Sequence, residues 1–356
     1  MMETFLGKIA GMIAAMPPDE ISATCIVFPN RRSGLFLKKY LGTVVTKPVW
    51  SPGIFSIIDF VETLSGKRVA DNLTLMLELY EAHKLASQKI MPYEDFVGWG
   101  ELILKDFNDT DLYLADPKEL FTHLTEAKAI AYWNPDGTPL TSIQQQYLEF
   151  FRSLYDVYLA FRERLEQKGL AYQGMLYRQV AENMPVAFRG IQSYSKVIFA
   201  GFNALNTAEN RIIRELEPLV TTQTLWDGDK YYTQNPAQEA GRYFRQHKKD
   251  FSKDAFQWEF DYFKEREREI SVIGVAGSTG QAKAAGNIIK ELTGQGIQPG
   301  NIAVVLADEN ILIPMLNSIP DNVDRMNITM GYPLKTTMAA QYTGILLRLF
   351  SNAEKF

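Results

Sequence analysis

Short apolar runs that pass directly into helical patterns are the feature that most constrains the fold of this chain. Residues 24–29, "TCIVFP", form one such run, and "RRSGLFLKKYL" follows it with apolar side chains at helical spacing. A continuous apolar run predicts a strand buried on both faces, which is typical of parallel sheets. Further runs are "KVIFAGF" (196–202), "TTQTLWDGD" (221–229), "ISVIGVAG" (270–277) and "NIAVVLAD" (301–308). Their succession predicts an α/β fold built on a parallel sheet.

Helical periodicity interrupts the strand pattern in the middle of the chain. Segments such as "LTLMLELYEAHKLASQ" and "IQQQYLEFFRSLYDVYLAFRERLEQKG" carry apolar residues every three or four positions, which predicts helices. We therefore expect a helical insertion at 71–185 within a first domain made of 1–70 and 186–265, and a second α/β domain that starts at 266–356. The last residues have a helical pattern with no following strand or cap, so we expect a piece of a longer protein.

The composition is that of a globular protein that dissolves in water, with 46% hydrophobic and 22% charged residues. No apolar run approaches the ~20 residues that span a bilayer, and the start has no signal-peptide pattern, so we expect a cytoplasmic protein without membrane contact. The one cysteine, Cys25, lies in an apolar strand pattern and is expected to be a buried thiol. The three histidines lack ligand spacing, so no metal site is expected. The net charge of −5 argues against nonspecific coating of nucleic acid, but it leaves room for a local basic groove.

The first strand and helix have the outline of a nucleotide site without its chemistry. A phosphate loop needs glycines, a lysine and a hydroxyl that binds magnesium, whereas Pro29 lacks an N–H donor and two bulky arginines occupy the turn. Nucleotide hydrolysis is therefore not expected here. The candidate contacts for a nucleic-acid backbone are Asn30, Arg31, Arg32 and Ser33. Alternatively, the arginines are solvated or paired with carboxylates of the helical insertion.

Three other polar or glycine-containing segments are candidates. Gly201 and Phe202 stand at a strand end where ATP-hydrolysing enzymes hold acids that bind magnesium, so metal-assisted hydrolysis loses its second component. Asp227 and Asp229 form either a polar or metal sensor at a strand end or a glycine turn with solvated acids. The segment "DFNDTDLYL" (106–114) places three acids in an expected polar turn, where they are predicted to cap helices.

The order of these units resembles superfamily 1 helicases of the UvrD and RecB type. Residues 24–41 stand at the Walker A position and 196–216 at the Walker B position, while "TLWDGDKYY" looks like the motif that follows. Where the family keeps Gly-Lys-Thr, this chain has Arg32-Ser33-Gly34, and where it keeps Asp-Glu, this chain has Gly201-Phe202. The departures fall on catalytic positions while the scaffold persists, which is similar to the inactivated helicase region of AddB and RecC.

The segments "FPNRRSGLFLKKYL", "AGFNALNTAENRII" and "NITMGYPL" are similar to AddB-type proteins of the PD-(D/E)XK nuclease family. The resemblance implies an inactivated, P-loop NTPase-like (RecA-like) first domain with a 1B-like insertion. It also implies binding of single-stranded DNA and docking of an AddA-like helicase-nuclease subunit in DNA repair and recombination. The full-length protein would be a DNA exonuclease that uses magnesium in a downstream domain, whereas no catalytic residue and no cofactor is expected in this stretch. Two alternatives stay open: an active ATP-dependent helicase with an unorthodox phosphate loop, and a protein-interaction scaffold without DNA contact.

Overall fold

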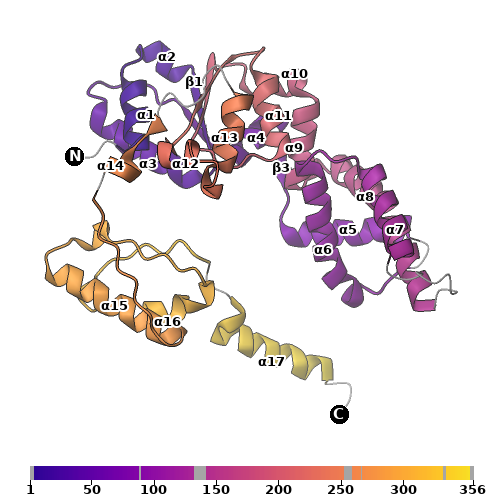
Figure 1. Ribbon diagram of the computed structural model, residues 1–356. Helices are drawn as coiled ribbons and strands as arrows, with labels where there is room; N and C mark the ends of the chain where they lie inside the picture. The colour runs from indigo at the N-terminus through magenta and orange to yellow at the C-terminus, as the bar shows by residue number, and fades with distance from the viewer. Residues whose placement is uncertain are drawn as a thin grey trace. The chain divides into compact units, whose positions relative to one another are not determined.

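The computed structural model describes residues 4–87, 90–131, 142–251, 259–265, 267–331 and 334–352 (Figure 1). The chain divides into two compact units, Met1–Glu267 and Arg268–Phe356.

A four-stranded parallel sheet forms the centre of the first unit. Its strand order is β2 (Gly53–Ser56), β1 (Thr24–Phe28), β5 (Lys196–Ala200) and β6 (Thr221–Leu225). In register, Ile26 of β1 lies opposite Ile54 on one side and Ile198 on the other. All residues of β1 are buried, as expected for a central strand covered on both faces. The predicted α/β fold with a parallel sheet is confirmed.

Alternating side chains of the central strands enter two different cores. Ile26 and Ile198 belong to the core on one face, whereas Val27 and Phe199 belong to the core on the other, because successive side chains of a strand point to opposite faces. Figure 1 shows the helices that cover the two faces. They are α1 (Phe5–Ala14) and α3 (Arg31–Val44) on the Ile26 face, and α4 (Ile57–Ser65), α9 (Gln173–Glu182) and α11 (Thr207–Leu216) on the other.

The cysteine of β1 lies inside this sheet. Cys25 is fully buried, and burial raises the pKa of its thiol. The prediction of a buried thiol is confirmed.

Local capping fixes where the helices next to the sheet begin. Ser56 ends β2 and accepts a hydrogen bond from the backbone N–H of Asp59 at 3.3 Å, which caps α4. Asn206 and Glu209 cap α11 reciprocally: each side chain accepts from the other residue's backbone N–H. These short-range bonds satisfy N–H groups that a helix leaves unpaired at its start.

Long helices separate β2 from β5. They are α5 (Asn72–Ala86), α6 (Tyr93–Leu112), α7 (Pro117–Ala131) and α8 (Ser142–Gln167). β3 (Arg68–Val69) and β4 (Leu170–Ala171) flank this run of helices, α5 to α8, and pair in parallel over two residues. Within the described residues, no helix is both long enough and apolar enough to cross a membrane.

The second unit has helices but no strands among its described residues. Its small core joins α15 (Ser278–Gly294) to α16 (Leu312–Leu316), and α17 (Met338–Asn352) follows. The apolar runs 270–277 and 301–308 form no strand among the described residues of this unit, and Val272 and Val305 are 94% and 90% exposed. The strand prediction is wrong for these runs, because an extended segment becomes a strand only when a neighbour takes its backbone hydrogen bonds.

Candidate functional site at the carboxyl edge of the sheet

The carboxyl ends of the four parallel strands meet at one edge of the sheet. In open α/β sheets, ligands bind outside this edge, where consecutive helices switch from one face to the other. The switch lies between β1 and β5, because α3 follows β1 on one face and α11 follows β5 on the other. The topology thus brings residues 30–33 and residues 201–202 to the same edge.

Asn30 caps α3 with its own side chain. Its Oδ1 accepts from the backbone N–H of Ser33 at 3.0 Å and from the Ser33 hydroxyl at 3.2 Å. In a phosphate loop, N–H groups at this position donate to the ligand. Here the side chain of Asn30 already occupies one of them.

Arg31 pairs with a carboxylate across the edge. Its guanidinium contacts Asp59 at 2.5 Å (Nη2 to Oδ1) and 3.0 Å (Nε to Oδ2), and the Ser56 hydroxyl donates to the same carboxylate at 2.5 Å. The Arg31 hydrogen bond is the main reason that the pKa of Asp59 is lowered. A carboxylate partner was one of the two expectations, but Asp59 lies on α4 and not on the helical insertion. Arg31 remains 74% exposed, so the pair lies at the surface.

Arg32 differs from its neighbour. It is exposed and makes no ion pair with any residue that the structure describes. The four candidate residues 30–33 line an open hollow of about 570 Å³ together with Leu6 and Phe36. Arg32 is therefore the cation of this hollow that is available to an anionic ligand.

Gly201 and Phe202 present no carboxylate at the edge. Gly201 has a φ of +73° and its N–H donates to the Leu225 carbonyl at 2.9 Å. A side chain at this φ is strained, and a Cβ would also lie 3.3 Å from the Phe5 ring. Phe202 is buried, with its ring 6.2 Å from that of Phe199. The backbone turn and the core thus account for both residues.

The two acids after β6 have separate environments. Asp229 caps α12 (Lys230–Thr233) by accepting from Tyr231 N–H at 2.9 Å, and it also accepts from Phe263 N–H at 2.9 Å. Asp227 has no hydrogen bond or ion pair within the described residues; desolvation raises its pKa, and nearby Lys8 opposes the rise. Asp229 is therefore neither a solvated acid nor an open ligand.

Nowhere in the described ranges are three or more His, Cys, Asp or Glu side chains grouped so that they could hold a metal ion.

No family model and no curated protein sequence matches this chain. The chemistry of the edge is set by the residues that form it. Those residues offer one unpaired cation and a partly occupied helix start.

A histidine that no sequence motif marks supports the loop after β5. His247 lies on α13 (Arg242–Asp250), is buried, and bonds through Nε2 to the Asn203 carbonyl at 2.7 Å. Since a carbonyl only accepts, Nε2 carries the proton. The ring stacks on Trp226 with centroids 4.7 Å apart, and burial is the main reason that its pKa is lowered. His247 therefore anchors the loop after β5 by donating to a backbone carbonyl of that loop.

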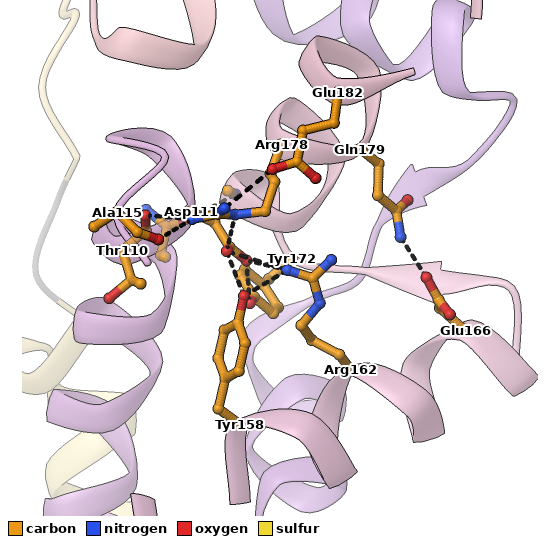
Figure 2. A network of polar contacts seen from close by, with 12 residues as sticks. Thr110, Asp111, Ala115, Tyr158, Arg162, Glu166, Tyr172, Arg178, Gln179 and Glu182 are labelled. Atoms are coloured by element: carbon orange, nitrogen blue, oxygen red, sulfur yellow. Dashed lines mark hydrogen bonds and ion pairs between the residues drawn. The ribbon is translucent and has the colours of Figure 1, made fainter. Parts of the chain in front are cut away.

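A buried carboxylate ties the helical insertion to the sheet side of the unit (Figure 2). Asp111 is fully buried on α6 and accepts from the Tyr158 hydroxyl at 2.6 Å, from Arg162 Nη1 at 3.1 Å and from Arg178 Nε at 2.6 Å, as well as from Tyr172. The network thus joins α6, α8 and α9. The prediction of a polar turn with capping acids at 106–114 is wrong here, because residues up to Leu112 continue α6.

Proposed function

We propose that this chain is the non-catalytic, helicase-like region of an AddB-type helicase-nuclease subunit. In this proposal the parallel sheet is a degenerate RecA-like motor domain formed by 1–70 and 186–265. Residues 71–185 are its 1B-like insertion, and 266–356 begin the second motor domain. The region binds single-stranded DNA and docks an AddA-like subunit during double-strand break repair, while exonuclease activity with magnesium belongs to a downstream domain of the full-length protein.

The observation that carries the proposal is the occupied start of α3. A phosphate loop leaves backbone N–H groups and a lysine free for the phosphates, but here Asn30 accepts from Ser33 and Arg31 is held by Asp59. An ATP phosphate would have to displace the Asn30 cap and would find no lysine. This supports a site that has lost nucleotide chemistry.

The strand end at Gly201 also supports the loss of nucleotide chemistry at this edge. Magnesium in nucleotide hydrolases needs an acidic strand end, and Gly201 lacks a side chain while Phe202 belongs to the core. Both components of ATP hydrolysis are therefore missing from one edge.

Arg32 favours a site that binds nucleic acid over a former nucleotide site that binds no ligand. An exposed guanidinium without an ion pair beside a helix start is suited to a backbone phosphate. The competing scaffold function predicts no role for this charge in binding.

Titration with ATP tests the loss of nucleotide chemistry. We expect no saturable, magnesium-dependent ATP binding by the wild-type chain and no hydrolysis. Saturable binding that Arg32→Ala abolishes, but that Lys105→Ala on the insertion leaves intact, would instead support an active ATPase with an unorthodox loop.

Single-strand binding tests the other half of the proposal. The anisotropy of a fluorescent oligothymidylate is followed at increasing salt concentration, and the log of affinity should fall with the log of salt at about −0.7 per phosphate contact. An absence of binding near ~50 mM salt, a concentration at which such contacts are strong, with the partner subunit present, would favour the protein-interaction scaffold.

A further inference from the structure

The segment around α3 is basic in a chain that is acidic as a whole. Residues 21–58 contain five lysines and arginines and no aspartate or glutamate, whereas the net charge of the chain is −5. This local excess of positive charge lies on α3 and on the loop that leads to β2. A surface of this kind attracts polyanions.

Two of the cations of α3 and an aromatic side chain lie on one exposed stripe of the helix. Leu37 and Leu41 face the sheet and are buried, whereas Arg32, Phe36 and Lys39 are exposed. The spacing of four and three residues puts these three side chains on one face of the helix. The 14 residues of α3 give this face a length of about 21 Å.

The loop after α3 also carries an exposed cation and an exposed aromatic ring. Trp50 is 85% exposed and Phe36 is 45% exposed, although large aromatic side chains are usually buried for most of their area. Lys47, also exposed, lies three residues before Trp50. Cations interleaved with exposed aromatic rings are typical of sites for single-stranded nucleic acid, since phosphates contact the cations and bases stack on the rings.

These cations have no partners on the protein. Arg32, Lys38, Lys39 and Lys47 make no ion pair with any residue in the described ranges. Arg31, at the start of the same helix, shows the contrast because it is held by Asp59. The unpaired charge is therefore complementary to an external polyanion.

We propose that this surface, made of Arg32, Phe36, Lys38, Lys39, Lys47 and Trp50, is the site where the chain binds single-stranded nucleic acid. The proposal rests on the single-strand binding proposed above and moves its main contacts from the sheet edge to the outer face of α3 and the loop after it. The cations bind the backbone, and Trp50 and Phe36 stack on bases. A helix that lies on lipid inserts apolar side chains; on α3, Leu37 and Leu41 are buried against the sheet, whereas Leu35 is exposed, so a membrane surface is the alternative that the vesicle experiment below tests.

Charge removal tests the backbone contacts. The full chain and its Lys38→Ala/Lys39→Ala variant are titrated with a fluorescent oligothymidylate at several salt concentrations. Two lost phosphate contacts should make the salt slope shallower by about 1.4, since each contributes about 0.7 for a single strand. The matched control is Lys105→Ala/Lys118→Ala, which removes the same charge from exposed positions of α6 and α7 and should leave the slope unchanged.

Ring removal tests the base contacts. Trp50→Ala should weaken binding about ten-fold by removing one stacked base while keeping the salt slope, and Trp50→Phe should restore most of the affinity. Tyr113→Ala, which removes another exposed ring, should have no effect. Far-UV circular dichroism of each variant identifies any loss of affinity that is due to unfolding.

Four outcomes would overturn the inference. If the wild-type chain binds but the α3 and Trp50 variants bind equally well, the surface is wrong and the proposed function stands. If the wild-type chain does not bind even with the partner subunit, both fall. If duplex DNA binds as tightly and Trp50→Ala has no effect, the single-strand assignment is wrong. If vesicles containing phosphatidylglycerol bind through Trp50 and oligothymidylate does not, the surface faces a membrane.

Discussion

Two apolar runs of similar composition reach different structures in the two units of this molecule. Residues 24–28 form β1, which lies between two partner strands and is buried throughout. Residues 301–308 carry a comparable run, yet no strand is assigned there and Val305 is 90% exposed. β-branched and apolar residues make a run suitable for a sheet, but the neighbouring strands decide whether the sheet forms.

The cores of the two units differ in the same way. Both faces of the first unit's sheet are covered by extended hydrophobic clusters, whereas the hydrophobic cluster of the second unit has three buried members among the described residues, Ala282, Ile289 and Met315. Stability per residue follows the apolar area that is removed from water. The first unit should therefore carry most of the cooperative stability of the chain.

Truncating a buried side chain of the first unit and an exposed side chain of the second should give the largest contrast. Phe199→Ala removes a buried ring of the first unit and should cost about 3–5 kcal/mol of unfolding free energy, whereas Val305→Ala should change it by about 0.5 kcal/mol or less. Urea unfolding followed by far-UV circular dichroism measures both. A loss of several kcal/mol for Val305→Ala would mean that the run 301–308 is buried in solution.

Removing the buried carboxylate of the first unit should cost nearly as much, because two arginines then lose their partner. Among the described residues, only the first unit buries charged side chains in this way. Asp111→Ala leaves Arg162 and Arg178 without their shared partner, and breaking a buried pair costs about 3–5 kcal/mol. Tryptophan fluorescence during urea unfolding follows the first unit selectively, because all five tryptophans precede residue 268. Asp109→Ala on the same helix is the control, and an equal loss for both variants would contradict the role of the network.

The pH dependence of stability should distinguish the units by a smaller amount. Burial lowers the pKa of both His83 and His247, so at these two side chains the folded first unit binds fewer protons than the unfolded chain. Its stability should be complete above about pH 6.5 and should fall as the pH drops, by up to about 1.4 kcal/mol per pH unit for each histidine. The second unit contains no histidine and should lack this dependence.

The double variant His83→Gln/His247→Gln provides the reference for this measurement. Burial raises the pKa of Glu209, so this side chain stabilises the fold as the pH falls and opposes the histidines. The difference in urea midpoint between wild type and variant, followed from pH 7 to pH 5, isolates the histidine contribution. If the difference does not change with pH, the two histidines are protonated alike in the folded and unfolded chains.

The sequence predicts those features that depend on neighbours along the chain. The buried strand at 24–28, the helix after it and the buried Cys25 follow from local patterns. The helix start at Asn30 depends on Ser33, only three residues away. These are the parts of the fold and the candidate site that could be read in advance.

Features that join distant segments could not be read in this way. Arg31 and Asp59 are 28 residues apart, and Asp111 meets its partners 47 to 67 residues away. No local pattern records such pairs, so the acids at 106–114 read as caps of a turn. The runs of the second unit fail for the opposite reason, because their local pattern is clear but no partner strand is formed with them.

The burial of Cys25 makes this chain convenient for site-specific labelling. Thiol reagents attack the thiolate, and Cys25 is both covered by the sheet and held as the neutral thiol. It is also the only cysteine. A cysteine introduced at an exposed position therefore becomes the one reactive thiol in the folded protein, so a single dye or spin label can be attached without first replacing a native residue.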